Sequence, residues 1–428
     1  METYGKILVF AMPAFLLLVL LETFYGYLIG KNTVRNLDTV SSLSSGVTNV
    51  VKDVLGLSIA IISYQWMVDH LAIFHVKSSV AIYVIAFFAL DFSGYWVHRI
   101  AHEYNFFWNN HIVHHSSEEF NLACALRQSI SVFVRLFTFF LLPAALFGVP
   151  AQVIAVVSPI HLFAQFWYHT QHIGKLGFLE KIIVTPSHHR VHHAINPLYL
   201  DKNYGQIFIF WDKWFGTYQE ELSEMPPVYG ITRPVSTWNP IKINFQHLWL
   251  LTKDAMQTNS LKDKLRIWLM PTGWRPTDVN ALHPVPKIED PYHFDKYDTR
   301  ASMGLHIWCW IQLLVLLAWS THLFGNIAII NKANPYYIYL YGLIIFIDVY
   351  AYSDLMDRNA SAWIFEGIKC ILGLGIIWKT GDWFVSDQMG GVIKYLVAGY
   401  LVVSLLVTLY FVVRHLREDR MGEWSIHK

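Results

Sequence analysis

The stretch HRIAHEYNFFWNNHIVHH, residues 98–115, decides the fold, and it has a counterpart in SHHRVHH at residues 187–193. Twelve of the 21 histidines of the chain lie between positions 98 and 193. Residues i, i+3 and i+4 share one face of a helix, so HxxxH and HxxHH each point two or three imidazole rings toward one place. Imidazole binds transition metals as the neutral base. The spacing therefore predicts a metal site.

The number of histidines indicates two metals rather than one. A tetrahedral zinc site uses about four ligands. Cysteine ligands are not expected, because Cys124, Cys309 and Cys370 lie far apart in apolar stretches. We therefore predict a dinuclear centre with an all-nitrogen shell, with a chance gathering of core and surface histidines as the alternative. The candidate ligands are His98, His102, His111, His114, His115, His169, His172, His188, His189, His192 and His193.

Composition places this site in a membrane protein. The 428 residues are 54% hydrophobic, 16% aromatic and 15% charged, with a mean hydropathy of +0.35. The net charge of +1 argues against nucleic acid as a partner, because it gives the protein no strong overall field. Apolar runs of about the length of a membrane span lie at residues 7–29, 54–74, 80–97, 131–146, 154–168, 305–330, 336–352, 363–379 and 392–413.

The short runs and the flanking charges predict a topology. We interpret residues 131–146 and 154–168 as a hairpin that enters the membrane and returns to the same side. Lys and Arg near the ends of spans stay cytoplasmic. Lys31, Arg99 and Arg414 then predict that the N-terminus lies outside and that every histidine box lies at the cytoplasmic face.

The expected fold is an all-α polytopic membrane protein. It comprises a transmembrane helix bundle, a histidine-rich cytoplasmic metal cap and an additional C-terminal four-helix membrane region. The predicted segments are N-terminal transmembrane helices at 1–79, the histidine-rich domain at 80–220, a cytoplasmic loop-rich segment at 221–303, and C-terminal transmembrane helices with a basic tail at 304–428. Nine prolines between positions 226 and 291 are expected to break any long helix in the cap.

The HRIAH, HIVHH and HRVHH boxes, in this order and spacing, resemble those of the fatty acid hydroxylase and sterol desaturase superfamily of membrane diiron enzymes. The resemblance covers roughly residues 91–218. Within it, HHSSEEFNL and LDKNYG look most like the branch that cleaves ether lipids. The chain departs from that branch after HT, where Gln171 replaces an acidic residue. This departure makes His172 a candidate to replace a carboxylate ligand.

The resemblance implies a chemistry for the site. Two iron ions would activate O2, whereas zinc has no redox chemistry. The expected reaction is hydroxylation of a lipid alkyl chain at the carbon next to the ether bond of an alkylglycerol, which gives a fatty aldehyde and a glycerol derivative. Tetrahydrobiopterin is implied as the reductant by the resemblance alone, and a protein reductase is the other electron donor to consider.

Polar residues near the boxes are candidates to orient the histidines or to act in catalysis. Asp91 precedes His98 by seven residues, so it lies on nearly the same helical face. The alternative for such residues is a helix cap, a solvated face or a turn. The main candidates are Asp91, Glu118, Asn121 and Asn203, with Glu103, Asp201 and Asp212 as further ones. His161 is expected to be a packed or hydrogen-bonded histidine.

Other functions fit the sequence less well. A sterol, carotenoid or fatty acyl hydroxylase or desaturase of the same superfamily is the main alternative, and a metal-ion transporter is the alternative outside enzymes. A zinc protease motif fails, because Phe106 stands where HExxH needs its second histidine. The location is expected to be the cytoplasmic membrane in a bacterium and the endoplasmic reticulum in a eukaryote.

Overall fold

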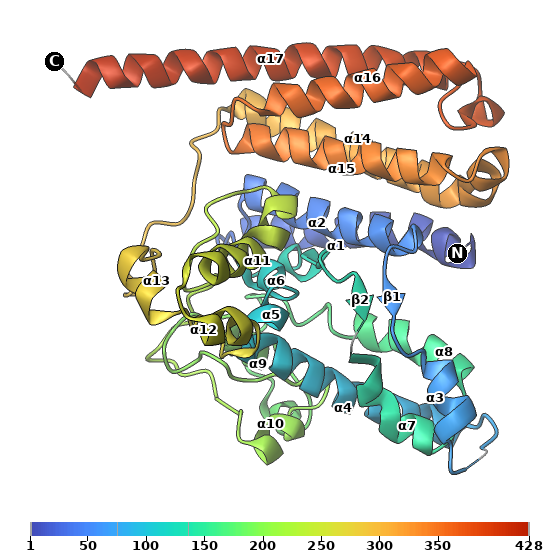
Figure 1. Ribbon diagram of the computed structural model, residues 1–428, viewed down its shortest axis with the longest axis vertical. Coiled ribbons are helices and arrows are strands. Elements are labelled where there is room, and N and C mark those ends of the chain that lie inside the picture. The colour runs from blue at the N-terminus through green and yellow to red at the C-terminus, as the bar shows by residue number, and fades with distance from the viewer. Residues whose placement is uncertain (1, 75, 136, 427–428) are drawn as a thin grey trace.

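The computed structural model describes residues 2–74, 76–135 and 137–426, and it is mostly helical (Figure 1). Within these residues the strands are β1 (Ile59–Ala60) and β2 (Val134–Arg135), which form one short parallel pair. The predicted all-α fold is confirmed.

Among the residues that the structure describes, five helices are long and apolar enough to cross a membrane. They are α1 (Glu2–Leu28), α4 (Val80–Glu103), α14 (Met303–Ala333), α15 (Tyr337–Met356) and α17 (Ile393–Ile426). Apolar side chains cover much of their outer surfaces, as expected for helices that face lipid.

The C-terminal helices α14, α15, α16 (Ala362–Thr380) and α17 pack together as one bundle (Figure 1). Helix α16 packs between α15 and α17 although it carries three charged residues. Two of them are neutralised inside the bundle, because Lys369 Nζ lies 2.7 Å from carboxylate oxygens of both Glu366 and Asp348. Burial of an ion pair requires such close partners.

Helix α1 and helix α2 (Asn36–Val54) join this bundle to the histidine-rich half of the molecule. Helix α1 packs on α14, and α2 contacts both α14 and α15. Apolar residues of α2, such as Val40, Val47 and Val51, are buried in the same core as Leu313 of α14. The site therefore rests on a helix bundle that anchors it from one side.

Two predicted spans are wrong. Residues 54–74 do not form one helix, because α2 ends at Val54 and Gly56 turns the chain with a left-handed φ of +66°. Strand β1 and the short helix α3 (Tyr64–Leu71) follow. Residues 131–146 are broken as well, and residue 136 lies outside the described residues. They contain β2, the 3₁₀ turn η2 (Phe137–Leu141) and α7 (Leu142–Leu146).

Helix α8 (Ala151–Phe163) accounts for most of the predicted run at 154–168. It packs along α4, and η2 and α7 also contact α4. The segments that we interpreted as a hairpin therefore line the helix that carries the first histidine box.

The cap follows the membrane-facing segments and consists of short helices and loops (Figure 1). Its helical elements are α9 (Pro186–His192), α10 (Phe210–Phe215), α11 (Pro240–Gln257), α12 (Leu261–Arg266), α13 (Thr277–Leu282), η3 (Gly177–Lys181) and η4 (Ile267–Leu269). Helix α11 is 18 residues long, so the expectation that prolines would break every long helix is wrong. Pro240 begins this helix, and the Asn239 side chain caps it.

Candidate metal centre

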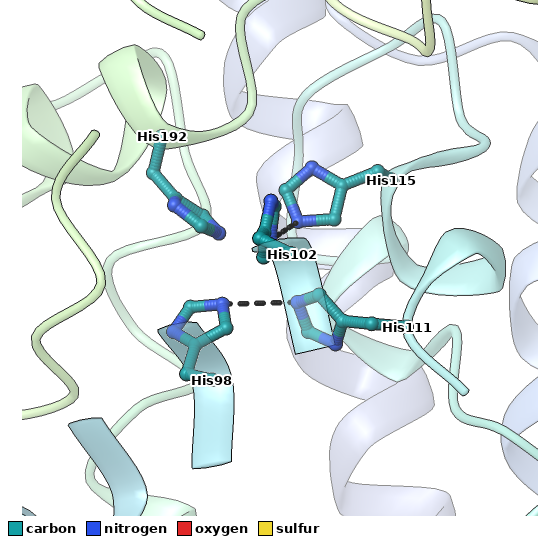
Figure 2. A group of neighbouring side chains, drawn as sticks. All are labelled: His98, His102, His111, His115 and His192. Atoms are coloured by element: carbon teal, nitrogen blue, oxygen red, sulfur yellow. Dashed lines mark hydrogen bonds between the residues drawn. The ribbon is translucent and has the colours of Figure 1, made fainter. Parts of the chain in front are cut away.

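A first group of five histidines converges on one point (Figure 2). Residues His98 and His102 come from the last turns of α4, His111 and His115 from the start and end of α6 (Ile112–His115), and His192 from α9. The Nε2 atoms of His98 and His111 are 2.9 Å apart, and those of His102 and His115 are 3.2 Å apart.

A second group contains His114, His169, His189 and His193, all of which are buried. Within it, His189 Nε2 lies 2.8 Å from His169 Nε2, and His193 Nε2 lies 3.1 Å from His114 Nε2. In each group the candidate ligand atoms lie within 4.8 Å of one another. Neighbouring histidines of one box belong to different groups: His115 and His192 to the first group, and His114 and His193 to the second.

Local sequence explains how the boxes are presented. Helix α4 begins at an N-cap, where Ser79 Oγ accepts a hydrogen bond from the backbone N–H of Ile82. The HxxxH spacing then places His98 and His102 on one face of its last turns. Helix α9 begins after Thr185 with proline at its first position. Both helices end at the site.

Backbone carbonyls orient four of the imidazole rings. Each ring donates its Nδ1–H to a carbonyl oxygen, at distances between 2.8 and 3.2 Å. The pairs are His98 with Tyr204, His114 with Arg127, His169 with Gln165, and His192 with Lys202. A proton on Nδ1 leaves the Nε2 lone pair free to bind a metal.

Burial keeps these imidazoles neutral. Loss of solvent lowers the pKa of His114 to about 3, and it lowers the pKa of His115, His189, His192 and His193 well below the ordinary value. Neighbouring histidines lower these values further, because two adjacent imidazolium charges would repel. Neutral imidazole is the form that binds metal.

The donor set fits transition-metal ions. The Nδ1–H groups of His114 and His169 donate to carbonyls, so their Nε2 atoms, which lie 3.3 Å apart, present lone pairs to each other, and His192 Nε2 has no hydrogen-bond partner. Such a buried arrangement is unfavourable unless a proton or a cation lies between the lone pairs. Groups of five and four nitrogen donors suit iron, which accepts imidazole ligands.

Both groups border one large cavity of about 1200 Å³. His98 and His111 of the first group and His114, His169 and His189 of the second line it. The remaining wall is largely apolar and comes from α1, α2, α8, the short helix α5 (Asn105–Trp108) and the segment near Phe133. The cavity can therefore bring an apolar chain up to the candidate metal ligands.

The structure brings nine of the eleven predicted ligands into the two groups and leaves His188 and His172 outside them. The ring of His188 belongs to a capping box, since its Nδ1 accepts from the backbone N–H of Thr185. The ring of His172 lies edge-on against Tyr25, with Nε2 at 3.5 Å from Thr33 Oγ1. Each ring thus has one nitrogen in contact with a protein group, while the other nitrogen, His188 Nε2 or His172 Nδ1, has no hydrogen-bond partner.

The four catalytic candidates make structural hydrogen bonds. Asp91 accepts from His161 Nε2 at 2.9 Å and from Trp211 Nε1 at 2.8 Å, as well as from two backbone N–H groups. Glu118 accepts from the backbone of Tyr297. The amide of Asn121 bonds to backbone groups of Thr33, Ala123 and Cys124, and that of Asn203 to backbone groups of His188 and Gln219. Their part in catalysis stays a prediction.

Among the further candidates, Asp201 and Asp212 lie close to the histidines. Asp201 Oδ1 is 3.6 Å from His102 Nδ1. Asp212 accepts from the backbone N–H of Tyr204, whose carbonyl holds His98. The sequence pattern did not single out Tyr204 itself, whose ring packs near His98, His102 and His192. The LDKNYG string, which contains this tyrosine, was the available signal.

Comparisons with known proteins agree with this geometry. A family model described as fatty acid hydroxylase matches residues 83–217. The chain is 32% identical over 424 residues to alkylglycerol monooxygenase of Homo sapiens, with 97% of this chain and 91% of that protein covered. The Danio rerio protein of the same name is 32% identical over 368 residues, with 85% and 80% covered.

A more distant relative shares only the central region. Ornithine lipid hydroxylase OlsE of Rhizobium tropici is 27% identical over 153 residues, which cover 36% of this chain and 46% of that protein. No solved structure matches the chain significantly.

The expected family resemblance is confirmed. The relatives are named monooxygenases and hydroxylases, so the protein is an oxidoreductase. Five apolar helices and the membrane enzyme family make it an integral membrane protein. The chain belongs to the alkylglycerol monooxygenase family, with a fatty acid hydroxylase domain at residues 83–217.

Proposed function

We propose that the protein is an iron-dependent monooxygenase that hydroxylates an alkylglycerol at the carbon next to the ether oxygen. The observation that carries this proposal is the apolar cavity of about 1200 Å³ that borders both histidine groups. A lipid chain can enter such a cavity, and its reacting carbon can lie beside the candidate ligands. The full-length relatives named alkylglycerol monooxygenase supply the substrate class.

The nine histidines would hold two iron ions, five at one site and four at the other. Bound iron would supply the redox chemistry for O2 activation and C–H oxidation. The protein orients the imidazoles through their Nδ1–H groups, keeps them neutral by burial, and positions the lipid chain along apolar walls. Exclusion of water by these walls also protects a reactive site from side reactions.

The reaction balances with an added reductant. One oxygen atom of O2 enters the C–H bond and the other leaves as water, which requires two electrons and two protons. The hydroxylated carbon carries both an ether oxygen and a hydroxyl group, so this hemiacetal breaks down to a fatty aldehyde and a glycerol lipid. Tetrahydrobiopterin is the reductant that we propose, and the cytoplasmic face is the side on which we place the site.

Product analysis tests this proposal. Membranes that contain the protein are incubated with labelled alkylglycerol, O2 and either tetrahydrobiopterin or NADH, with the His114→Ala variant as control. We expect labelled aldehyde with tetrahydrobiopterin only, and none from the variant. Absence of aldehyde with both donors would contradict the proposal.

A second candidate is a hydroxylase of another lipid, which the partial similarity to ornithine lipid hydroxylase favours. That activity would leave a stable hydroxylated lipid in the same incubation and release no aldehyde. A metal-ion transporter would instead move metal without O2 consumption.

A further inference from the structure

One face of α1 forms a wall of the cavity. The residues that line it recur at the spacing of a single helical face: Ile7, Leu8, Ala11, Met12, Phe15 and Leu16. Other positions of the same helix, among them Phe10, Ala14 and Leu18, are exposed. Helix α1 therefore lines the cavity with the first set of residues, of which Ile7 is also 60% exposed, and not with Phe10, Ala14 and Leu18.

This wall leads away from the histidines. The Phe15 ring lies 4.8 Å from that of Phe166, and the carbonyl of Phe166 accepts a hydrogen bond from the backbone N–H of His169. Farther along α1, Gly26 lies beside the ring of His172. The C-terminal part of α1 is thus near the site, and Ala11 and Ile7 lie one and two turns farther from it than Phe15 does.

The length of this wall suits a single lipid chain. Eight residues of helix separate Phe15 from Ile7, which corresponds to about 12 Å. The hydrocarbon part of one membrane leaflet is about 15 Å thick, half of the bilayer core. Leu43 and Val47 of α2 and Leu317 of α14 also line the cavity, so apolar side chains surround it. An extended chain can lie along α1 with one end at the histidines.

We infer that the part of the cavity along α1 holds the alkyl chain of the substrate, and that Ala11 sets the longest chain accepted. This inference rests on the proposed function. Ala11 has the smallest side chain of the lining face of α1, so its methyl group leaves space that a larger residue would fill. It lies one turn beyond Phe15, where the distal carbons of a long chain would pass.

Substitution at Ala11 tests the inference with a matched control. Ala11→Phe places a ring in the chain path, whereas Ala14→Phe makes the same change at an exposed position of α1 that does not line the cavity. A series of alkylglycerols of increasing, defined chain length serves as substrate. We expect the ratio of turnover on the longest to the shortest chain to fall roughly tenfold in Ala11→Phe, because hydrophobic pockets discriminate methylene groups to this extent. We expect Ala14→Phe to keep the wild-type ratio and Ala11→Leu to fall between.

A binding measurement separates this inference from the proposed function. The same lipids are tested for thermal stabilisation of each variant, and we expect stabilisation by the longest chains to be lost in Ala11→Phe only. Length-dependent stabilisation without aldehyde release would overturn the proposed reaction and support the chain site. Identical length profiles for wild type, Ala11→Phe and Ala11→Leu, in turnover and in stabilisation, would overturn the inference. Ala11→Leu supplies this test if Ala11→Phe does not fold.

Discussion

The carboxylate of Glu22 in α1 accepts a hydrogen bond from Thr170 Oγ1 at 2.6 Å, and Thr170 directly follows His169. The other carboxylate oxygen accepts from the backbone N–H of Leu122, also at 2.6 Å. Glu22 is only 7% exposed, so water does not compete for these bonds. One side chain of α1 therefore fixes the segment that presents a ligand of the second group.

Removal of this carboxylate should loosen the second group. Glu22→Ala leaves two donors without their acceptor, at a cost of about 1–3 kcal/mol for each buried group. We expect iron affinity to fall roughly 10- to 100-fold, as for other residues that support ligands indirectly. Iron per chain after dialysis against a graded chelator measures this effect. Glu22→Gln keeps an amide oxygen as acceptor and should lose less iron; full iron retention in Glu22→Ala would contradict the prediction.

Alanine substitutions should distinguish histidines that bind iron from histidines that only lie nearby. His114→Ala removes a candidate ligand that lies close to both His169 and His193, so we expect bound iron to drop by about half or more and aldehyde release to be lost. His172→Ala should retain the wild-type iron content, because its ring bonds to Thr33. Metal analysis of purified protein decides between these outcomes. Equal iron loss in both variants would place His172 among the ligands after all.

His188 should act on stability through the start of α9. His188→Ala removes the acceptor for the backbone N–H of Thr185, and loss of a helix cap costs about 1 kcal/mol. We expect a small decrease in thermal stability with unchanged iron stoichiometry. Calorimetry and metal analysis on the same preparation measure the two quantities. His188→Asn, which offers another acceptor, serves as the control; a lost iron in either variant would argue against a capping role.

Asp91 should be a stability residue of the domain. Its carboxylate is fully buried and accepts from His161, Trp211 and two backbone N–H groups, which ties α4 to α8 and to the loop before α10. Asp91→Ala leaves these donors unpaired, so we expect a loss of about 2–5 kcal/mol or failure to fold. Expression level and denaturation of the detergent-solubilised protein measure this. Near-normal stability combined with lost turnover would instead indicate a direct catalytic role.

The cap should become less stable in acid through His247. Burial lowers the pKa of this histidine to about 4, with a smaller effect of Arg233, and its Nε2–H donates to the carbonyl of Asn105. The folded protein thus holds His247 neutral where the unfolded chain, with a pKa near 6.5, already binds a proton. Its contribution is intact above about pH 6.5 and is lost progressively as the pH falls toward 4.

The variant His247→Gln isolates this effect, because glutamine can keep a donor for Asn105 and does not titrate. We expect the stability difference between pH 7 and pH 5 to shrink in the variant relative to wild type. Urea denaturation monitored by tryptophan fluorescence at both values measures the difference. If wild type and His247→Gln lose the same stability between pH 7 and pH 5, groups other than His247 cause the acid sensitivity.

The sequence predicted the histidine groups well because helical periodicity acts over one turn. HRIAH on α4 and HRVHH on α9 needed only local geometry, and the number of histidines indicated two groups of ligands. The pattern could not reveal the role of His188, because a capping histidine and a ligand have the same spacing from His192. The signal for the capping role lies instead in the TPSH string, in which Thr185 is an N-cap residue and His188 occupies the third helical position.

Long-range contacts and the number of spans were harder to predict. Glu22 precedes Thr170 by 148 positions, so no local period connects them. The apolar run at 54–74 satisfied a hydropathy criterion, but Gly56 and the pairing of Ile59 with Val134 broke it into a turn and a strand. Hydropathy measures the preference of a segment for an apolar environment, and the protein interior offers that as well as lipid does.

The backbone acceptors at the metal centre have a consequence for variation in this family. Four imidazole rings are held by backbone carbonyl oxygens, which every amino acid possesses. These carbonyls belong to Tyr204, Arg127, Gln165 and Lys202. Point substitutions at these four positions can alter packing or charge, yet they cannot delete the acceptor. Insertions or deletions in the same loops would move it. The orientation of the ligands therefore depends on the length of these loops more than on the identity of their side chains. Side chains around the metal centre can then change to suit different lipids without loss of the acceptors.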